Sequence, residues 1–132
     1  MLEPFISTLI YFVISIVIVL IGLFIFENLT RSYKDLEEIK NGNVAVSLSV
    51  IGKVIGICII LAFAIYSSNV IWETIIWGAF GVILQMIAYV LYDLFTRNFS
   101  VQEQLSKNNI AVGLMSMGVS IGLALVIGAS IT

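Results

Sequence analysis

Lys53 raises the first chemical question in this sequence, because it is a cationic residue inside an almost uncharged apolar segment. Ser49 precedes it by four residues, so the two side chains share one face if the segment is helical. A serine and a lysine at this spacing can form a nucleophile and base pair. The rest of the chain gives catalysis no support, since it has no histidine, Walker loop, nucleophile elbow, HExxH motif or pair of cysteines. The sequence therefore predicts a protein that is not an enzyme, and it implies no cofactor and no metal.

The depth of Lys53 is its second unusual property. It follows Asn43 by ten residues, which places it about 15 Å along a helix, near the middle of a hydrocarbon core about 30 Å thick. A cation there costs at least about 2.5–3.5 kcal/mol, so a partner or access to water is expected. Gln85 falls at a similar depth and can accept a hydrogen bond, but it cannot neutralise charge. Lys53 is therefore expected either to be uncharged or to contact water or a carboxylate from another subunit. Two interpretations of the residue stay open, a functional site and a structural hydrogen bond in a bundle or an oligomer interface.

Composition identifies the elements that must position these residues. The chain has 132 residues, of which 61% are hydrophobic and 11% charged, and its mean hydropathy is +1.15. Stretches of eighteen or more apolar residues are typical of transmembrane helices. Four stretches meet that length, at about 5–26, 43–66, 71–95 and 109–131. We therefore predict an all-α integral membrane protein, with residues 1–132 forming a single transmembrane domain of four helices.

The basic residues predict the orientation of these helices. Those outside the apolar segments lie only in the first and third connectors, at Arg31, Lys34, Lys40, Arg97 and Lys107. Short loops rich in Lys and Arg stay in the cytoplasm, so both termini are expected outside, with Glu3 and Glu73 on the outer side. The net charge of −2 gives no reason to expect nucleic-acid binding.

The two halves of the chain resemble each other when they are aligned so that Asn43 falls on Asn109. Asn43, Ala45, Gly52 and Gly56 are among the residues of the first half with identical counterparts in the second, and the connector residues Thr30 and Arg31 also match. We predict two repeats, at 1–66 and 67–132. Each repeat holds two helices, so the repeats are expected to be parallel and related by a pseudo-two-fold axis along the membrane normal.

Three stretches carry a resemblance to a known family: EIKNGNVAVSLSVIGKVIG, WGAFGVILQMIAYVLYDL and NNIAVGLMSMGVSIG. They resemble domain-of-unknown-function family 350, the UPF0719 group of small bacterial inner-membrane proteins. The resemblance implies a four-helix protein of two tandem repeats in the cytoplasmic membrane of a bacterium. It implies no established activity, although some members are associated with envelope-stress and phage-shock-type gene neighbourhoods. Val119 aligns with Lys53, so any role of the lysine belongs to one half only.

Small residues predict where helices pack. They recur on one face of the second and fourth segments, at Ala45, Gly52, Gly56, Ala111, Gly118 and Gly122, beside a second stripe of Ser116, Ser120, Ala124 and Gly128. Small residues let helix backbones approach closely in lipid. We interpret the first set as a helix-packing seam, within one chain or in a homodimer, and a pore or ligand path along it is the alternative.

Polar residues gather at the predicted cytoplasmic ends of the helices. This cluster comprises Glu27, Arg31, Asn43, Asp93, Arg97 and Asn109. Each acid precedes an arginine by four residues, which is the favourable order for an ion pair on a helix. The two asparagines are expected to be N-caps of the second and fourth helices. Interfacial ion pairs are one interpretation of the cluster, and a cytoplasmic mouth for an anion is the other.

The third segment carries its own polar stripe, at Thr74, Gly78, Gly81, Gln85, Tyr89 and Tyr92. A face of this kind is expected to point into a bundle and to form hydrogen bonds there.

Two functions are compatible with these patterns. The first is a non-enzymatic membrane component that assembles with itself, or with another membrane protein, in envelope maintenance or stress response. The alternative is a small homo-oligomeric channel or transporter whose path is lined by Lys53, Gln85 and Glu73. The expected partners are the lipid bilayer, further copies of the chain and a second membrane protein.

Overall fold

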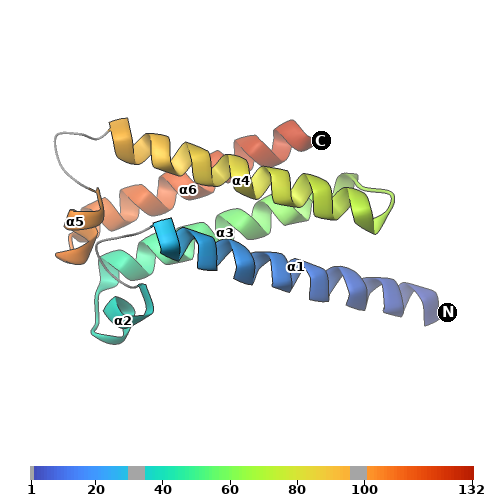
Figure 1. The fold of residues 1–132 in the computed structure, drawn as a ribbon, viewed down its shortest axis with the longest axis horizontal. Helices are drawn as coiled ribbons and strands as arrows, with labels where there is room; N and C mark the ends of the chain where they lie inside the picture. Colours follow the sequence, from blue (N-terminus) through green and yellow to red (C-terminus); the bar gives the residue numbers. More distant parts are fainter. Residues whose placement is uncertain (1, 30–34, 96–100) are drawn as a thin grey trace.

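The computed structural model describes residues 2–29, 35–95 and 101–132, except the side chain of Phe95. These ranges form helices only: α1 Leu2–Leu29, α2 Asp35–Lys40, α3 Val44–Ser67, α4 Ile71–Phe95, α5 Val101–Ser106 and α6 Ile110–Ile131 (Figure 1). Four of them, α1, α3, α4 and α6, are long and apolar enough to cross a membrane. The predicted fold class, all-α with four membrane-spanning helices, is confirmed.

The short helices α2 and α5 lie together at one end of the bundle, which we call the connector end (Figure 1). The turn between α3 and α4 lies at the opposite end. Helices α1 and α4 end at the connector end, and α3 and α6 begin there (Figure 1). Lys40 and Lys107 lie at the ends of α2 and α5, so the basic residues that the structure describes on connectors are at the connector end.

Asparagine caps start both α3 and α6, as predicted from the sequence. Asn43 Oδ1 accepts a hydrogen bond from the Val46 amide at 3.0 Å, and Asn109 Oδ1 accepts one from the Val112 amide at 3.4 Å. The backbone angles of the two caps agree within one degree. Each side chain satisfies an amide that has no partner within its helix. The two N-cap predictions are confirmed.

The residue before each cap turns the chain through the left-handed region. Gly42 has φ of +87°, and Asn108, the equivalent position of the second half, has φ of +59°. Glycine and asparagine are the residues that adopt this conformation at least cost. The amides of Asn43 and Asn109 donate to the Glu38 and Gln104 carbonyls, both at 3.0 Å. The two connectors thus end in the same turn.

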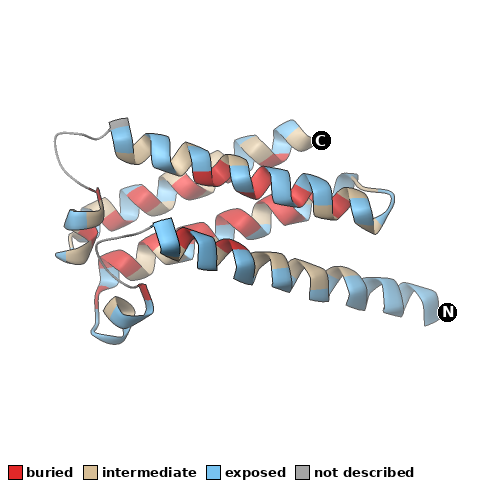
Figure 2. Cartoon of the chain, in the orientation of Figure 1, coloured by how far each residue is buried: buried red, intermediate tan, exposed pale blue. Residues whose placement is uncertain are grey.

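The core of the bundle is centred on α3, which packs most extensively against α6 (Figure 2). The backbones approach so closely that a Cβ on Gly52 would lie 2.6 Å from Met117 Cα, and one on Gly113 would lie 2.8 Å from Ala45 Cα. Helix α1 is the least packed of the four long helices, since only Gly22 and Phe26 are buried along it. It diverges from the other helices toward its N-terminus (Figure 1).

Only the α3 half of the predicted helix-packing seam lies in the contact between α3 and α6. Ala45, Gly52 and Gly56 are buried on α3, but Ala111, Gly118 and Gly122 are exposed on α6 and take no part in the contact within one chain. The small residues of α6 that face the bundle are instead Gly113, Ser116, Ser120, Ala124 and Gly128. The serines carry hydroxyls that need partners away from lipid, whereas a glycine loses nothing by facing lipid. Helix α6 is therefore rotated to bury its serine stripe.

Candidate functional site

Lys53 is buried between aromatic rings from two other helices. Its side chain is 2% exposed, and Nζ lies 5.2 Å from the ring centroid of Phe26 on α1 and 4.8 Å from that of Tyr89 on α4. The two rings meet edge to face with centroids 6.0 Å apart. A desolvated cation–π contact contributes about 2 kcal/mol. Two of them are comparable with the insertion cost of about 2.5–3.5 kcal/mol for a lysine at mid-membrane.

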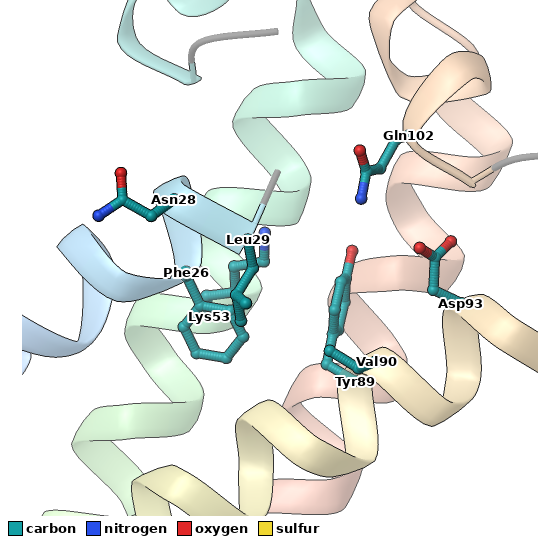
Figure 3. Close-up of a pocket in the computed structure, with 8 residues that line it drawn as sticks. All are labelled: Phe26, Asn28, Leu29, Lys53, Tyr89, Val90, Asp93 and Gln102. Atoms are coloured by element: carbon teal, nitrogen blue, oxygen red, sulfur yellow. The ribbon is translucent and has the colours of Figure 1, made fainter. Parts of the chain in front are cut away.

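A cavity of about 230 Å³ lies beside Lys53. Its lining includes Asn28 and Leu29 from α1, Val90 and Asp93 from α4, and Gln102 from α5 (Figure 3). A volume of this size accommodates several water molecules. The polar lining residues come from the ends of α1 and α4 and from α5, so the cavity lies toward the connector end.

The ammonium group of Lys53 is directed into this cavity (Figure 3). Over the part of the chain that the structure describes, Nζ has two aromatic contacts but no hydrogen bond and no ion pair. Aromatic faces attract the charge, but they do not replace the hydrogen bonds that three N–H donors make in water. Lys53 therefore presents a cation and free donors to whatever occupies the cavity.

Asp35, the first residue of α2, is a second acidic group that interacts electrostatically with Lys53. It is 7% exposed. Burial raises the pKa of its carboxyl above the ordinary value, the positive charge of Lys53 lowers it, and the negative charge of Glu27 raises it again. Because burial is the largest of these causes, folding favours the protonated form of Asp35.

Three hydroxyls form a cluster next to Lys53. Tyr89 Oη and Ser116 Oγ are 2.7 Å apart, Ser49 Oγ and Ser116 Oγ are 3.1 Å apart, and Ser49 Oγ and Tyr89 Oη are 3.4 Å apart. Ser49 is thus engaged with α4 and α6, and no hydrogen bond joins it to Lys53 among the described residues. This arrangement gives the Ser–Lys pair considered from the sequence no support.

Gln85 packs against Gly56, three residues after Lys53 on α3, and no hydrogen bond joins it to Lys53 among the described residues. Its side chain is fully buried, and Nε2 donates to the Ser120 carbonyl at 3.3 Å. A Cβ on Gly56 would collide with Nε2, so this glycine is required for the amide to fit. Gln85 Oε1 has no hydrogen-bond partner in the described ranges. Tyr89, one turn along α4, occupies the place beside Lys53 that depth alone assigned to Gln85.

Glu73 lies far from this site. Its Oε2 accepts a hydrogen bond from the Asn69 amide at 2.9 Å, in the turn between α3 and α4. Gln85 lies twelve positions further along α4, which corresponds to about 18 Å along a helix. Of the three polar residues predicted to line a path, the structure places Lys53 and Gln85 near each other and Glu73 at the opposite end of the bundle.

Comparison with known proteins decides the family. The sequence model of the family described as "Domain of Unknown Function (DUF350)" matches residues 1–131. The chain belongs to this family.

Curated relatives agree with the DUF350 assignment. The chain is 32% identical over 121 residues to the UPF0719 transmembrane protein YshE of Bacillus subtilis strain 168, covering 92% of this chain and 90% of that protein. It is 30% identical over 104 residues to the UPF0719 inner membrane protein YjfL of Escherichia coli K12, covering 79% and 76% respectively. No solved structure matches the chain significantly. This DUF350 chain is accordingly a multi-pass membrane protein.

The polar cluster expected at one end of this DUF350 protein is only partly described. Asn43 Nδ2 donates to the Leu105 carbonyl at 2.9 Å, and the Ala45 amide donates to Asn108 Oδ1 at 3.0 Å, so the starts of α3 and α6 are joined. Asp93 lines the Lys53 cavity. Glu27, Asp93, Asn43 and Asn109 all lie toward the connector end, whereas Arg31 and Arg97 fall outside the described residues.

The polar stripe of α4 faces inward, as predicted. Thr74, Gly78, Gly81 and Gln85 are buried, and Tyr89 and Tyr92 are half-buried. Sequence reasoning missed several residues of the site, among them Phe26, Asp35 and Gln102. Phe26 looks like any lipid-facing aromatic residue, and the two polar residues lie on short connector helices with no pattern that points to Lys53.

Proposed function

We propose that this DUF350 protein is a non-enzymatic membrane component that assembles with further copies of itself through the outer face of α6. One observation carries the proposal. Gly118 and Gly122 are four residues apart and exposed, and a Cβ built on either would meet no atom within 4 Å. This pair is a small-xxx-small pattern on a lipid-facing surface.

Membrane physics explains why such a surface suits self-association. Lipid tails are as apolar as leucine, so helices associate through close van der Waals contact, which small residues permit. In this chain, Gly52 and Gly113 already provide such a contact between α3 and α6. Gly118 and Gly122 offer a second contact of the same kind with no partner in the described chain. A second copy of α6 presents the complementary surface by symmetry.

The repeat and the orientation belong to the same proposal. Equivalent turns at Gly42 and Asn108, each followed by an asparagine cap, support two tandem repeats. Lys40 and Lys107 at the connector end support a cytoplasmic location for that end, with both termini outside. We assign the protein to the bacterial inner membrane, in line with the name of the Escherichia coli relative. The resemblance described above supports a role in envelope maintenance or stress response, alone or with another membrane protein.

A conducting path has less support. Five buried side-chain oxygens have no hydrogen-bond partner in the described ranges, among them Gln85 Oε1, Ser120 Oγ and Thr74 Oγ1. An oligomer with a wet axis would provide partners. Glu73, however, is about 18 Å from Gln85 along α4 and is bonded within a turn. Flux of common ions through liposomes that contain the protein, abolished by Lys53→Met, would favour this alternative over the leading proposal.

The test of self-association is energy transfer between donor- and acceptor-labelled copies in liposomes, measured as the protein is diluted with lipid. The double variant Gly118→Leu, Gly122→Leu is expected to shift the half-maximal transfer to at least about tenfold more protein per lipid, which corresponds to about 1.4 kcal/mol. The matched control is Ala62→Leu, which adds similar bulk at an exposed position of α3 and is expected to leave association unchanged.

Two results would overturn the proposal. The first is a wild-type chain that stays monomeric at every protein-to-lipid ratio. The second is equal association of the double variant and the wild type, because the α6 face would then take no part in the contact.

A further inference from the structure

The Lys53 cavity borders an apolar groove between α1 and α4. A pocket of about 330 Å³ shares Leu29 and Val90 with the cavity. Another pocket of about 200 Å³ shares Ile25, Ile83 and Met86 with the pocket of about 330 Å³. The three hollows therefore lie next to one another along α1 and α4, and only the one at the connector end has polar lining residues.

The two ends of this surface have opposite chemical requirements. At the polar end, Lys53 is 2% exposed and presents an ammonium group with no hydrogen bond or ion pair among the described residues. A buried charge of this kind calls for an anion that accepts hydrogen bonds. At the other end, the groove has no polar lining and faces the hydrocarbon, so only an apolar chain suits it. One molecule that joins an anionic head to an apolar tail would satisfy both.

We propose that this surface binds a single membrane phospholipid. Its phosphate accepts hydrogen bonds from Lys53 Nζ in the cavity, and one of its acyl chains lies in the groove between α1 and α4. Phe26 and Tyr89 hold the ammonium group from two sides, which directs its donors toward the phosphate. The site is complete within one chain, and it does not depend on the assembly proposed above.

The dimensions of the groove agree with this occupant. Its lining extends on α1 from Ile18 to Leu29, which corresponds to about 17 Å along a helix. One leaflet of the hydrocarbon core is about 15 Å thick. The backbone of Lys53 lies near the middle of the membrane, but its side chain extends toward the connector end, to Phe26 and the cavity beside Asn28 and Asp93. The phosphate is therefore expected to lie in this cavity, deeper than the other head groups of its leaflet, with its chain in the groove.

Asp93 makes the site selective for the head group. It lines the same cavity as Lys53, and Tyr89 lies between the two residues in the close-up view (Figure 3). A carboxylate beside a phosphate site repels a second anionic group and attracts an amine. A carboxylate can accept several hydrogen bonds, so Asp93 can contact an amine while it keeps another interaction. We therefore expect a zwitterionic phospholipid with a primary amine, phosphatidylethanolamine, to bind in preference to phosphatidylglycerol.

The first experiment measures retention of phosphatidylethanolamine by native mass spectrometry, as the lipid is titrated into detergent-solubilised, delipidated full-length protein. Lys53→Met is expected to weaken retention at least tenfold, because it keeps the side-chain length and removes the charge. Lys53→Arg is expected to keep retention within about threefold, and the exposed connector substitution Lys107→Met is the control for loss of a lysine. Circular dichroism on each variant confirms that the helices are intact.

The second experiment tests the tail and separates a lipid from a soluble phosphate. Ile83→Trp fills the groove, and Ile76→Trp adds the same bulk at an exposed position of α4 outside it. Only Ile83→Trp is expected to lower retention, again by at least tenfold. Glycerophosphoethanolamine and inorganic phosphate, which have no acyl chains, are expected not to displace the bound lipid at concentrations a hundredfold above it.

Several outcomes would overturn the proposal. Equal lipid retention by Lys53→Met and wild type would show that Lys53 does not bind the phosphate. Displacement of the lipid by glycerophosphoethanolamine would show that the ligand is a soluble phosphate compound. If Ile83→Trp changes the oligomeric state and leaves lipid retention unaltered, the occupant of the groove is a second copy of the chain. Preference for phosphatidylglycerol would overturn the role given to Asp93.

Discussion

Helices α3 and α6 begin in the same way and are then used differently. Each follows a left-handed residue, starts at an asparagine cap and carries two glycines nine and thirteen residues after that cap. On α3 the two glycines are buried against α6 and Gln85, whereas on α6 they are exposed. Local hydrogen bonds therefore determine where a helix enters the bundle, and the partners of its polar side chains determine how it is rotated there.

The difference between α3 and α6 is clearest in the position of Lys53. Its counterpart in the second half is Val119, which is half-buried on α6. Lys53 lies on the inner face of α3, where aromatic residues of α1 and α4 meet it. Of these two equivalent positions, only that of the first half thus places a charge inside the bundle.

The largest difference in stability is expected between substitutions of the equivalent glycines on α3 and α6. Gly52→Leu should destabilise the fold severely, by about 3 kcal/mol or more, because a Cβ there would lie 2.6 Å from the backbone of Met117. Gly118→Leu should change the stability of the monomer by less than about 0.5 kcal/mol, since nothing lies within 4 Å of it. Thermal unfolding in detergent, at dilution where the chain is monomeric, measures both. Equal effects would mean that the two helices are packed alike.

The caps should show a smaller difference. Asn43→Ala removes a cap and also the hydrogen bond from Nδ2 to the Leu105 carbonyl, which joins the two halves. We expect it to cost about 2 kcal/mol, against about 1 kcal/mol for Asn109→Ala, whose Nδ2 donates within its own connector. Chemical denaturation of the two variants under one condition provides the measurement. A greater cost for Asn109→Ala would contradict the assignment.

The two halves also differ at Asp35, which should make the stability of the protein depend on pH. Its counterpart is Val101, which is fully buried. Burial raises the pKa of Asp35 in the folded state, so its contribution to stability is present at low pH and is lost as pH rises through that pKa. Asp35→Asn should therefore stabilise the protein at neutral pH and have little effect at pH 3. Melting temperatures from pH 3 to pH 8 test this, and stabilisation confined to acidic pH would contradict it.

The smallest effect is expected at the connector surface. Lys107 Nζ lies 3.0 Å from Glu103 Oε1, but both side chains are mostly exposed. An exposed ion pair at this spacing contributes about 0.3–0.5 kcal/mol. Lys107→Gln should thus shift the unfolding midpoint only slightly, and less at high salt than at low salt, because salt screens exposed charges. A shift as large as that of Asn43→Ala would show that the pair does more than stabilise its own turn.

Sequence patterns could predict the helices, their caps and the polar face of α4, because each depends on residues close together in the chain. The length of an apolar run, the asparagine before it and the spacing of Thr74, Gly78 and Gln85 are all local signals. Depth along a helix also placed Lys53 and Gln85 near each other. These predictions required no knowledge of neighbouring helices.

The rotation of α6 and the surroundings of Lys53 could not be predicted in the same way. Helix α6 carries a stripe of small residues on each of two faces, so periodicity alone does not show which face is buried. The choice between the glycine stripe and the serine stripe of α6 depended on hydrogen bonds to Ser49 and Tyr89, from two other helices. Phe26 is on a different helix from Lys53 and far from it in the sequence, with no local signal for the contact.

The aromatic pair around Lys53 has a consequence for the order in which the protein is made. Chains emerge from the ribosome N-terminus first, so α1 with Phe26 is synthesised before α3, and Tyr89 on α4 is synthesised after it. When α3 enters the bilayer, Phe26 is the ring already there to receive the lysine, and Tyr89 arrives only with the next segment. The helix that is least packed in the folded bundle thus carries the aromatic ring that is synthesised before Lys53.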